Sequence, residues 1–371
     1  MHSGPAAVVS AGAVRELAMN VALDVVRAQI LAVLAGWGAP ADTAATVADV
    51  LVAADLAGID SHGVTLLTEY AELVTGSRLD VTARPSIVRE APATALVDAG
   101  GGFGHPAGVL AVRLAVAKAR RCGVGATSVV NSHHFGAAGY YAALAERDGM
   151  VGIAMTTAHT VCVVPTRGAV PMLTTNPIAC AAPDFLLDMS TSTVAVNKVR
   201  VRGLTGQALP AGWAVDDEGS PVADAGEAGR RIAEHRGGLT PLGGDETTSG
   251  YKGYGLNVMV QLLAGALGGG TFAALDDPGR GGPDNVGHFF VALDPAAFRD
   301  AADFRADVAS TLGALRATPP LAEGEPVLVA GDREAAAREH RAVHGIPVPD
   351  AVADGVRHLC AEWGVPFLLA G

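Results

Sequence analysis

The order of periodic segments along the 371 residues is the feature that most constrains the fold. Apolar residues recur at helical spacing from Leu23 to Leu34 and onward to about residue 80. Short β-branched runs separated by glycine and proline follow, with one helix among them at 106–121. Helical spacing returns at 300–315 and 333–344. This order predicts an α/β or α+β chain with a central sheet between N- and C-terminal helical parts.

Shifts in composition divide the chain into four stretches. They predict a flexible leader at 1–20, a helical part at 21–80, a sheet-rich central domain at 81–300, and C-terminal helices at 301–371 that pack back on the N-terminal part. Asp42 is the expected N-cap of the second helix, and Gly58 is its expected C-terminal stop. Residues 201–250 are glycine-rich and polar, which predicts long functional loops.

An uncharged stretch at residues 253–275 is long enough to span a bilayer. It contains Asn257 and Gln261, and three glycines break it at 268–270. The apolar core between them is only about three helical turns long, which favours a buried helix over a membrane span. Because no basic segment precedes an apolar run at the N-terminus, we also expect a cytoplasmic protein without a membrane partner.

The composition excludes two broad classes of protein. Hydrophobic residues make up 50% of the chain and charged residues 17%, which is the opposite of the balance in disordered proteins. The 26 basic and 38 acidic side chains give a net charge of -12, and aromatic residues make up only 5%. Both values argue against a nucleic-acid partner. The four cysteines form no C-x-x-C pair and have no metal-like spacing, so we expect buried thiols and no metal site.

The chain lacks the dinucleotide-binding fingerprint of Rossmann domains. No predicted strand leads into a G-x-G-x-x-G helix start, and the glycines at 100–104 lack that spacing and precede His105 and Pro106. A nucleotide would therefore need a different, non-Rossmann frame.

Asp60, Ser61 and His62 follow a predicted helix stop, where a loop can direct side chains into a cleft. An imidazole beside a hydroxyl and a carboxylate can exchange protons near neutral pH. The triplet alone is a weak signal, because a single histidine is more often a surface residue or a satisfied core residue.

His133 and His134 follow another predicted strand directly, within the segment NSHHFG. Polar residues at a strand end often form ligand sites in α/β proteins. Adjacent residues on an extended chain point to opposite faces, which disfavours joint metal chelation. We therefore expect one of the two histidines to face a site.

The residues Asp188 to Ser192, DMSTS, end a further apolar strand. The carboxylate could orient a histidine, and the hydroxyls could bind ribose or phosphate. The alternative is a helix N-cap, which serine and threonine commonly supply.

Lysine occurs only at Lys118, Lys198 and Lys252. Lys252 lies at a predicted helix start, where the backbone amides add to its charge and favour an anion. His340 and His344 are four residues apart on a helix but lack the zincin pattern, so a solvated helix face is favoured there.

Seven segments stand in an order that carries a family resemblance: AADLAGIDSHGV, NSHHFGAAGYYA, TTNPIACAAP, LLDMSTSTVA with Lys198, GWAVDDEG, GYKGYGL and NVGHFFVALDP. From about Val21 to Ile346 the chain resembles the type-2 malate/L-lactate dehydrogenase family. That family also includes L-sulfolactate dehydrogenase, ureidoglycolate dehydrogenase, 2,3-diketogulonate reductase and the Δ1-piperideine-2-carboxylate reductases. Seven ordered motifs are more specific than any one of them.

The resemblance implies a mixed or mostly antiparallel sheet that holds NADH or NADPH, and a homodimer that acts on a small 2-oxo or 2-hydroxy acid. Hydride transfer to C=O or C=N builds negative charge on the heteroatom, which a histidine can quench. The implied catalytic residues are His62, His134 and Asp188. The implied cofactor contacts are Asp188, Met189, Ser190, Thr191, Ser192, Lys252, Gly331, Asp332 and Arg333. The implied substrate contacts are Ser61, Thr156 and Asn176.

The chain departs from the family pattern beside these motifs. Relatives often carry an arginine shortly after SHG that meets the substrate carboxylate, and Leu66 stands in its place here. Glu69 stands where a second basic residue is common, and the segment MTTAHT departs from the usual MTNS, so that Thr157, Ala158 and His159 replace its polar groups. Arg167 and Arg200 are the candidate substitutes for the lost cation.

Two alternatives stay open. The loss of the arginine favours a reductase of cyclic imines such as piperideine or pyrroline. The same departures favour a catalytically silent family member that serves as a binding subunit, although the retained histidines argue against it. The sequence specifies neither NAD over NADP nor the direction of the reaction.

Overall fold

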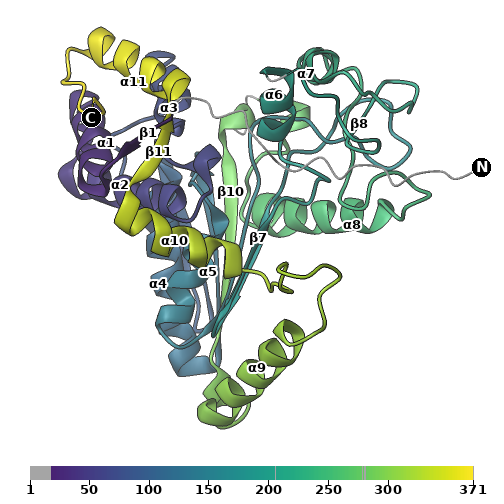
Figure 1. Cartoon of the computed structure of the whole chain (residues 1–371). Helices are drawn as coiled ribbons and strands as arrows, with labels where there is room; N and C mark the ends of the chain where they lie inside the picture. The colour runs from purple at the N-terminus through teal and green to yellow at the C-terminus, as the bar shows by residue number, and fades with distance from the viewer. Residues whose placement is uncertain (1–17, 205, 278, 280, 371) are drawn as a thin grey trace, which may run out of the picture.

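A seven-stranded mixed sheet forms the centre of the computed structural model, which describes residues 18–204, 206–277, 279 and 281–370 (Figure 1). Its strands lie in the order β2 (Ser86–Glu90), β3 (Thr94–Gly102), β4 (Val124–Ser132), β10 (Val286–Leu293), β5 (Val151–Thr156), β6 (Ile178–Ala182) and β7 (Phe185–Met189). β3 and β4 pair in parallel, and the other neighbours pair antiparallel. The predicted mixed sheet is confirmed.

Both faces of this sheet are buried. Ala154 and Phe290 lie on the face that packs against α4 and α5. Their chain neighbours Ile153 and Phe289 lie on the opposite face, against α8 and the π-helical turn that continues it. Strands covered on both faces need apolar residues at nearly every position, which accounts for the high hydrophobic content. The covering elements are α4 (Gly104–Cys122), α5 (Ala138–Arg147), α8 (Tyr251–Val260) and the π-helical turn Gln261–Ala266.

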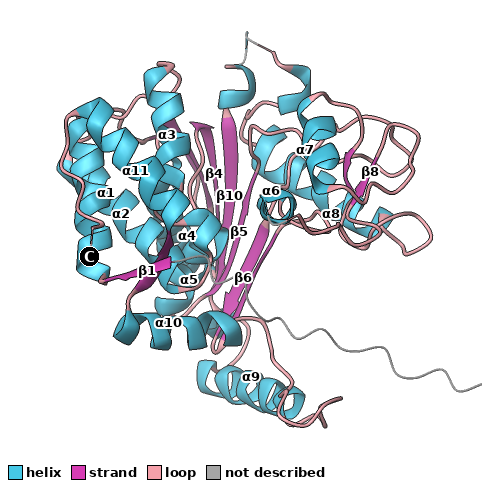
Figure 2. Cartoon of the chain, turned by 45° about the horizontal axis from the view of Figure 1, so that its top comes forward, coloured by secondary structure: helices cyan, strands magenta, loops and turns pink. Residues whose placement is uncertain are grey.

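A helical lobe on one side of the sheet is built from both ends of the described chain (Figure 2). Its elements are β1 (Ala18–Val21), α1 (Leu23–Gly36), α2 (Ala41–Leu56), α3 (Leu66–Thr75), β11 (Ile346–Pro349) and α11 (Asp350–Trp363). β1 pairs antiparallel with β11, and Trp37 contacts Trp363 edge to face at 6.2 Å between ring centroids. The sequence did not predict α11, because Pro347 and Pro349 stand directly before it and Gly355 interrupts its apolar pattern.

The boundaries of the first elements differ from two expectations. Residues 1–17 of the predicted leader lie outside the described residues, and its last three residues belong to β1. α2 begins directly after Pro40, so Asp42 is inside the first turn and is not the N-cap; its carboxylate pairs with Arg84. Gly58 follows the end of α2 with φ of 77°, a conformation that favours glycine, and the predicted helix stop is confirmed.

A small lobe lies on the other side of the sheet (Figure 2). It contains α6 (Val196–Leu204), β8 (Ala214–Val215), α7 (Ala225–Ala233) and β9 (Gly238–Leu239), where the sequence predicted long loops. Ala225, Ala228 and Ile232 form a buried stripe on α7, and the Asp224 carboxylate caps its first turn. A stripe made mostly of alanine gives a weak hydrophobic signal, so the sequence pattern concealed this helix.

Two helices connect β10 of the sheet to β11 of the helical lobe. α9 (Ala301–Arg316) projects from the body of the molecule, and α10 (Asp332–His344) returns to contact α2 (Figure 1). Asn257 and Gln261, within the uncharged stretch, are buried in α8 and the π-helical turn, whereas Leu262 and Leu267 are exposed. The predicted helix is therefore present, but only one of its sides is buried. No helix within the described ranges is both long and apolar enough to cross a membrane.

Candidate active site

A buried carboxylate fixes the loop that carries His62. Asp55, near the end of α2, accepts a hydrogen bond from Val64 N at 2.8 Å, and burial raises the pKa of its carboxyl to about 7. Gly63 lies so close that a Cβ there would stand 1.6 Å from Asp55 Oδ1. The turn that presents His62 therefore requires glycine at 63. Sequence reasoning missed Asp55, although an acidic residue within the apolar run AADLAG is a visible signal.

The three residues of the predicted triplet have different partners. Asp60 forms an ion pair with Arg341 of α10, whose Nη1 also donates to the Asp55 carbonyl at 2.6 Å. Ser61 Oγ lies 2.8 Å from His62 Nδ1. Asp60 thus anchors the loop to α10, and Ser61 orients the imidazole.

His62 and His134 come together from segments 72 residues apart in the chain. Their ring centroids lie 5.5 Å apart. The Tyr70 hydroxyl, from α3, lies 2.8 Å from His134 Nδ1 and 3.4 Å from Nε2 of His105 on α4. The neighbouring His133 does not belong to this group. It is buried, and the charge of Asp284 raises its pKa against the effect of burial. We refer to His62, Tyr70, His105 and His134 as the histidine cluster.

Burial sets the charge of this cluster. It lowers the pKa of His62, and it lowers the pKa of His134 to about 3 with a further contribution from His62. Burial also drives the pKa of His105 well below its usual value. Because removal from water disfavours the charged imidazolium, these rings are neutral at physiological pH and can accept a proton.

A second histidine network lies within the sheet behind the cluster. His288 on β10 is fully buried, and its Nδ1 lies 2.6 Å from the Thr156 hydroxyl, while its Nε2 lies 2.8 Å from Ser132 Oγ. Phe135 stacks on its ring at 4.4 Å between centroids. Thr156 was a predicted substrate contact, but its hydroxyl is hydrogen-bonded to His288 inside the sheet. His288 lies in the segment NVGHFFVALDP, but sequence reasoning did not single it out.

Asn176, the other predicted pocket residue, is also fully buried. Its Nδ2 donates to the Asn257 side chain at 2.8 Å, and Asn257 Nδ2 donates to Thr174 O at 2.8 Å. These bonds join the segment before β6 to α8. They account for the polar residues inside the uncharged helix, because buried amides require partners.

The departures from the family pattern meet beside the cluster. Leu66 is buried at 5% exposure, and His159 Nε2 lies 3.5 Å from Glu69 Oε1. The two expected substitutes for the lost cation are elsewhere. Arg167 pairs with Glu246, and Arg200 lines a cavity between α6 and α7 in the small lobe.

Asp188 lies on β7, the last strand of the sheet, and does not touch the histidines. Its Oδ2 accepts a hydrogen bond from Gly139 N, in the first turn of α5, at 2.7 Å. Burial raises the pKa of its carboxyl to about 6, and Glu334 of α10 adds to that rise. No hydrogen bond or ion pair joins Asp188 to His62 or His134 in the part of the chain that the structure describes.

The predicted cofactor residues gather around the two ends of β7. Beyond Met189, Thr191 and Ser192 are buried against the loop that leads to α8. Leu242 N donates a hydrogen bond to Thr191 O, and Ser192 forms an antiparallel β-bridge with Pro241. Lys252 is exposed in the first turn of α8, without an ion pair among the described residues. The Ser190 hydroxyl has only weak contacts within its own turn, at 3.1 and 3.4 Å.

The other group adjoins the start of β7. Ala330 O accepts from Leu186 N, and Gly331 adopts φ of 102° against Leu186. Arg333 is exposed, whereas Asp332 is already paired with Arg316. An exposed lysine at a helix start, hydroxyls and an exposed arginine are donors that suit phosphate and ribose, so this set fits a dinucleotide. No group of three or more side chains suited to a metal ion occurs within residues 18–204, 206–277, 279 and 281–370.

Comparison with known proteins places this fold among dehydrogenases. The chain is 37% identical over 364 residues to a malate dehydrogenase of Pyrococcus abyssi, which covers 96% of this chain and 98% of that protein. It is 32% identical over 343 residues to the L-sulfolactate dehydrogenase of Methanocaldococcus jannaschii, with 91% and 95% covered. The crystal structure of malate dehydrogenase from Entamoeba histolytica superimposes with a TM-score of 0.89 at 31% identity, covering 94% and 99% of the two chains.

The class is thus that of dehydrogenases and reductases with a sheet unlike the Rossmann fold. Residues 21–357 match the malate/L-lactate dehydrogenase family, and the chain belongs to that family. The predicted resemblance is confirmed, and the chain is an oxidoreductase.

Proposed function

We propose that the chain transfers a hydride between NADH or NADPH and carbon 2 of a 2-oxo or 2-hydroxy acid or a close derivative, with His62 and His134 exchanging the proton. The pairing of two neutral imidazoles at 5.5 Å carries this proposal. A hydroxyl occupies Nδ1 of each ring, from Ser61 and Tyr70 respectively. Nε2 of each ring is left to meet the substrate oxygen.

The bound nicotinamide supplies the hydride chemistry. When a 2-hydroxy acid is oxidised, its hydroxyl proton must leave as the hydride departs from carbon 2. Nδ1 of His134 accepts a hydrogen bond from Gly136 N at 3.3 Å, so the proton of that neutral ring is on Nε2, from which it can donate to the substrate oxygen. Nδ1 of His62 can donate to Ser61 Oγ, which leaves the lone pair on Nε2 to accept the hydroxyl proton, and the lowered pKa keeps this ring neutral at neutral pH. In the reverse direction the same nitrogen returns the proton to the oxygen. Tyr70 and Ser61 hold the rings in position.

We assign the cofactor to the edge of the sheet along β7, where Lys252, Ser190 and Arg333 would bind its phosphates and ribose. We also propose a cytoplasmic homodimer. Support for the homodimer comes from the family resemblance. Analytical ultracentrifugation tests the dimer, and a monomer at micromolar concentration would contradict it.

A two-stage experiment tests the activity. Nicotinamide fluorescence titration with NADH and NADPH comes first, and we expect one of them to bind. A panel of 2-oxo acids with that cofactor follows, with absorbance at the nicotinamide band as the readout. Binding without turnover of any acid would contradict the assigned chemistry. Failure to bind either cofactor would support the alternative of a silent binding member.

Reduction of a cyclic imine is the second candidate, and the buried Leu66 favours it. The cation that relatives commonly offer to a substrate carboxylate is missing there. The chain is also 36% identical over 246 residues to a Δ1-pyrroline-2-carboxylate/Δ1-piperideine-2-carboxylate reductase of Pseudomonas putida, which covers 64% of this chain. Turnover of a cyclic imine without turnover of any 2-oxo acid would establish this candidate in place of the first.

A further inference from the structure

An acidic side chain lies beside the histidine cluster, and it has no role in the chemistry above. Glu69 directly precedes Tyr70 on α3, and 46% of its side chain is exposed. His159 reaches it from the loop after β5, with its Nε2 3.5 Å from Glu69 Oε1. Glu69 thus combines a fixed position with access to solvent.

The charge of Glu69 acts on both proposed catalytic residues. It raises the pKa of His62 and of His134, opposing the effect of burial. In turn the hydrogen bond from His159 lowers the pKa of Glu69, and His134, His159 and His62 lower it further. The carboxylate is therefore ionised at neutral pH and lies within electrostatic range of the atoms that would hold the substrate.

The cations of this region are already neutralised. Arg78 binds Asp284 through Nε and Nη2, with 2.7 Å between Nε and Oδ2. Arg341 is paired with Asp60 on the loop that carries His62. Among the described residues, Glu69 is the only carboxylate found to act on the charge of both rings, and 46% of its side chain is exposed.

We propose that Glu69, held by His159, is the residue that determines substrate specificity, and that it selects acids whose far end carries a cationic nitrogen. The inference rests on the proposed 2-oxo acid chemistry and names its substrate class. An ammonium or guanidinium group would share the Glu69 carboxylate with His159. A second carboxylate would meet a like charge at the same place, and repulsion within about 5 Å in a partly buried site lowers kcat/KM by roughly 10- to 100-fold.

Three acids differ in the charge of their far end: 5-guanidino-2-oxopentanoate, 2-oxohexanoate and 2-oxoglutarate. Because the guanidino acid is also the longest, the change in their ratios between the wild type and Glu69→Gln separates charge from size. The guanidino acid carries a cation that does not condense with its own carbonyl as an amine would. We expect kcat/KM to fall in the order cationic, neutral, anionic. Glu69→Gln keeps the shape of the side chain and removes its charge. We expect it to reduce the preference for the cationic over the neutral acid about 10-fold and to raise activity on 2-oxoglutarate.

Glu72→Gln is the matched control, because Glu72 is exposed on the same helix. It should leave the order of the three acids unchanged. His159→Gln should give a smaller loss of preference than Glu69→Gln, because the charge stays while its partner changes. Equal ratios in the wild type and in Glu69→Gln would overturn the proposal, as would a wild type that prefers 2-oxoglutarate.

Calorimetry separates this inference from the proposed function. The same three acids are titrated into the enzyme loaded with the oxidised form of the cofactor that it binds, which cannot reduce them, for the wild type and Glu69→Gln. If the cationic acid binds most tightly but none of the acids is turned over, Glu69 has the proposed role and the proposed reaction is wrong. Turnover with no charge preference, in rates and in binding, would sustain the reaction and reject the role of Glu69.

Discussion

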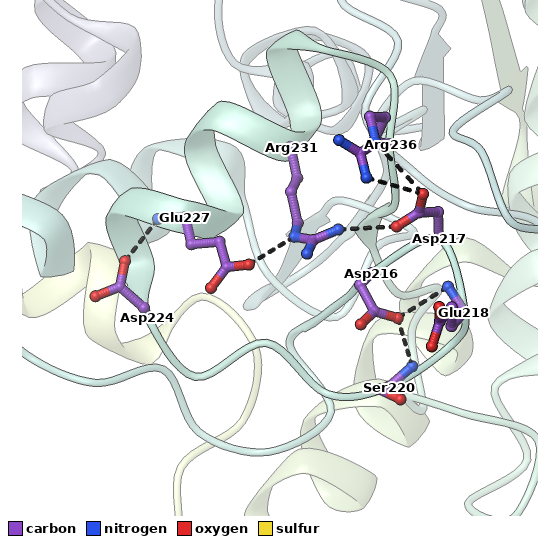
Figure 3. A network of polar contacts seen from close by, with 8 residues as sticks. All are labelled: Asp216, Asp217, Glu218, Ser220, Asp224, Glu227, Arg231 and Arg236. Atoms are coloured by element: carbon purple, nitrogen blue, oxygen red, sulfur yellow. Dashed lines mark hydrogen bonds and ion pairs between the residues drawn. The ribbon is translucent and has the colours of Figure 1, made fainter.

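Two polar regions of the molecule differ in how water reaches them. The histidine cluster is enclosed by α2, α3 and α4, and its rings are held neutral by burial. The small lobe carries a network of charges on its surface (Figure 3). There Arg231 binds Asp217 and Glu227 at 2.9 Å each, and Arg236 also reaches Asp217 at 3.3 Å.

The length of a hydrogen bond alone therefore does not tell how much the bond contributes to stability. Both regions have bonds of ordinary length. In the cluster, a lost partner leaves a polar atom without water to replace it, which carries the full desolvation penalty. On the surface, water and salt replace a lost partner, so exposed ion pairs contribute little. The expected effects of substitution therefore fall steeply from the first region to the second.

His62→Gln gives the largest expected effect. A glutamine cannot accept a proton from the substrate hydroxyl, so we expect kcat to fall by about 10²- to 10⁴-fold with intact cofactor binding. Steady-state rates and nicotinamide fluorescence measure the two quantities. His358→Gln, on the exposed side of α11, is the control and should behave as the wild type. Wild-type activity in His62→Gln would show that another group moves the proton.

Asp55 should make stability depend on pH. Its folded pKa of about 7 lies above the unfolded value near 3.8, so the native state binds the proton more tightly. The stability that this group contributes is complete below about pH 4 and is lost as pH rises to about 7, a change on the order of 4 kcal/mol.

Asp55→Asn removes that titration. Urea unfolding at several pH values between 4 and 8 should show the stability of the wild type, relative to the variant, declining as pH rises. Asp24→Asn, at an exposed position of α1, should keep the wild-type trend. Parallel curves for the wild type and Asp55→Asn would mean that the Asp55 carboxyl titrates alike in both states.

Gly63→Ala tests the close approach that shapes the catalytic loop. The added Cβ would stand 1.6 Å from Asp55 Oδ1, and the buried carboxylate must shift away from Val64 N. We expect a loss of about 2–3 kcal/mol in the free energy of unfolding, measured by urea titration. The control is Gly229→Ala on α7, where a Cβ meets no atom within 4 Å, and it should be neutral or slightly stabilising. Equal stabilities of the two variants would contradict this account.

Tyr70→Phe removes the hydroxyl between His134 and His105. Because Tyr70 positions a ring and does not itself exchange the substrate proton, we expect kcat to fall about 10-fold with little change in KM, and stability to fall by about 1 kcal/mol. Rates across pH and urea unfolding measure these effects, and exposed Tyr251→Phe is the control. A kcat as low as that of His62→Gln would place Tyr70 in the proton transfer itself.

Sequence motifs singled out the two histidines that the structure brings together, but they did not single out the residues around them. His62 and His134 lie in short contiguous motifs, and such motifs can be recognised without knowledge of the fold. Tyr70 was visible only as an apolar position on a helix, because its bond to His134 joins residues 64 apart. The contact of Glu69 with His159 joins residues 90 apart, and each looked like an isolated departure from a pattern.

The same limit explains which elements were missed. Periodicity is legible where large apolar residues recur, as from Leu23 to Leu34 in α1. The stripe of α7 consists mainly of alanine, and α11 follows two prolines and contains Gly355. Tertiary packing stabilises these helices, since their own patterns are weak.

Arg231→Gln gives the smallest expected effect and tests the charged surface of the small lobe. The substitution breaks both ion pairs of Arg231, while Arg236 still neutralises Asp217. Because these groups remain in contact with water, we expect the melting temperature to stay within about 2 °C of the wild type, with kcat/KM unchanged. Raising the salt concentration should shrink even that difference, since salt screens exposed charges. A drop of about 8 °C or more, persisting at high salt, would show that the small lobe depends on this network as the catalytic loop depends on Asp55.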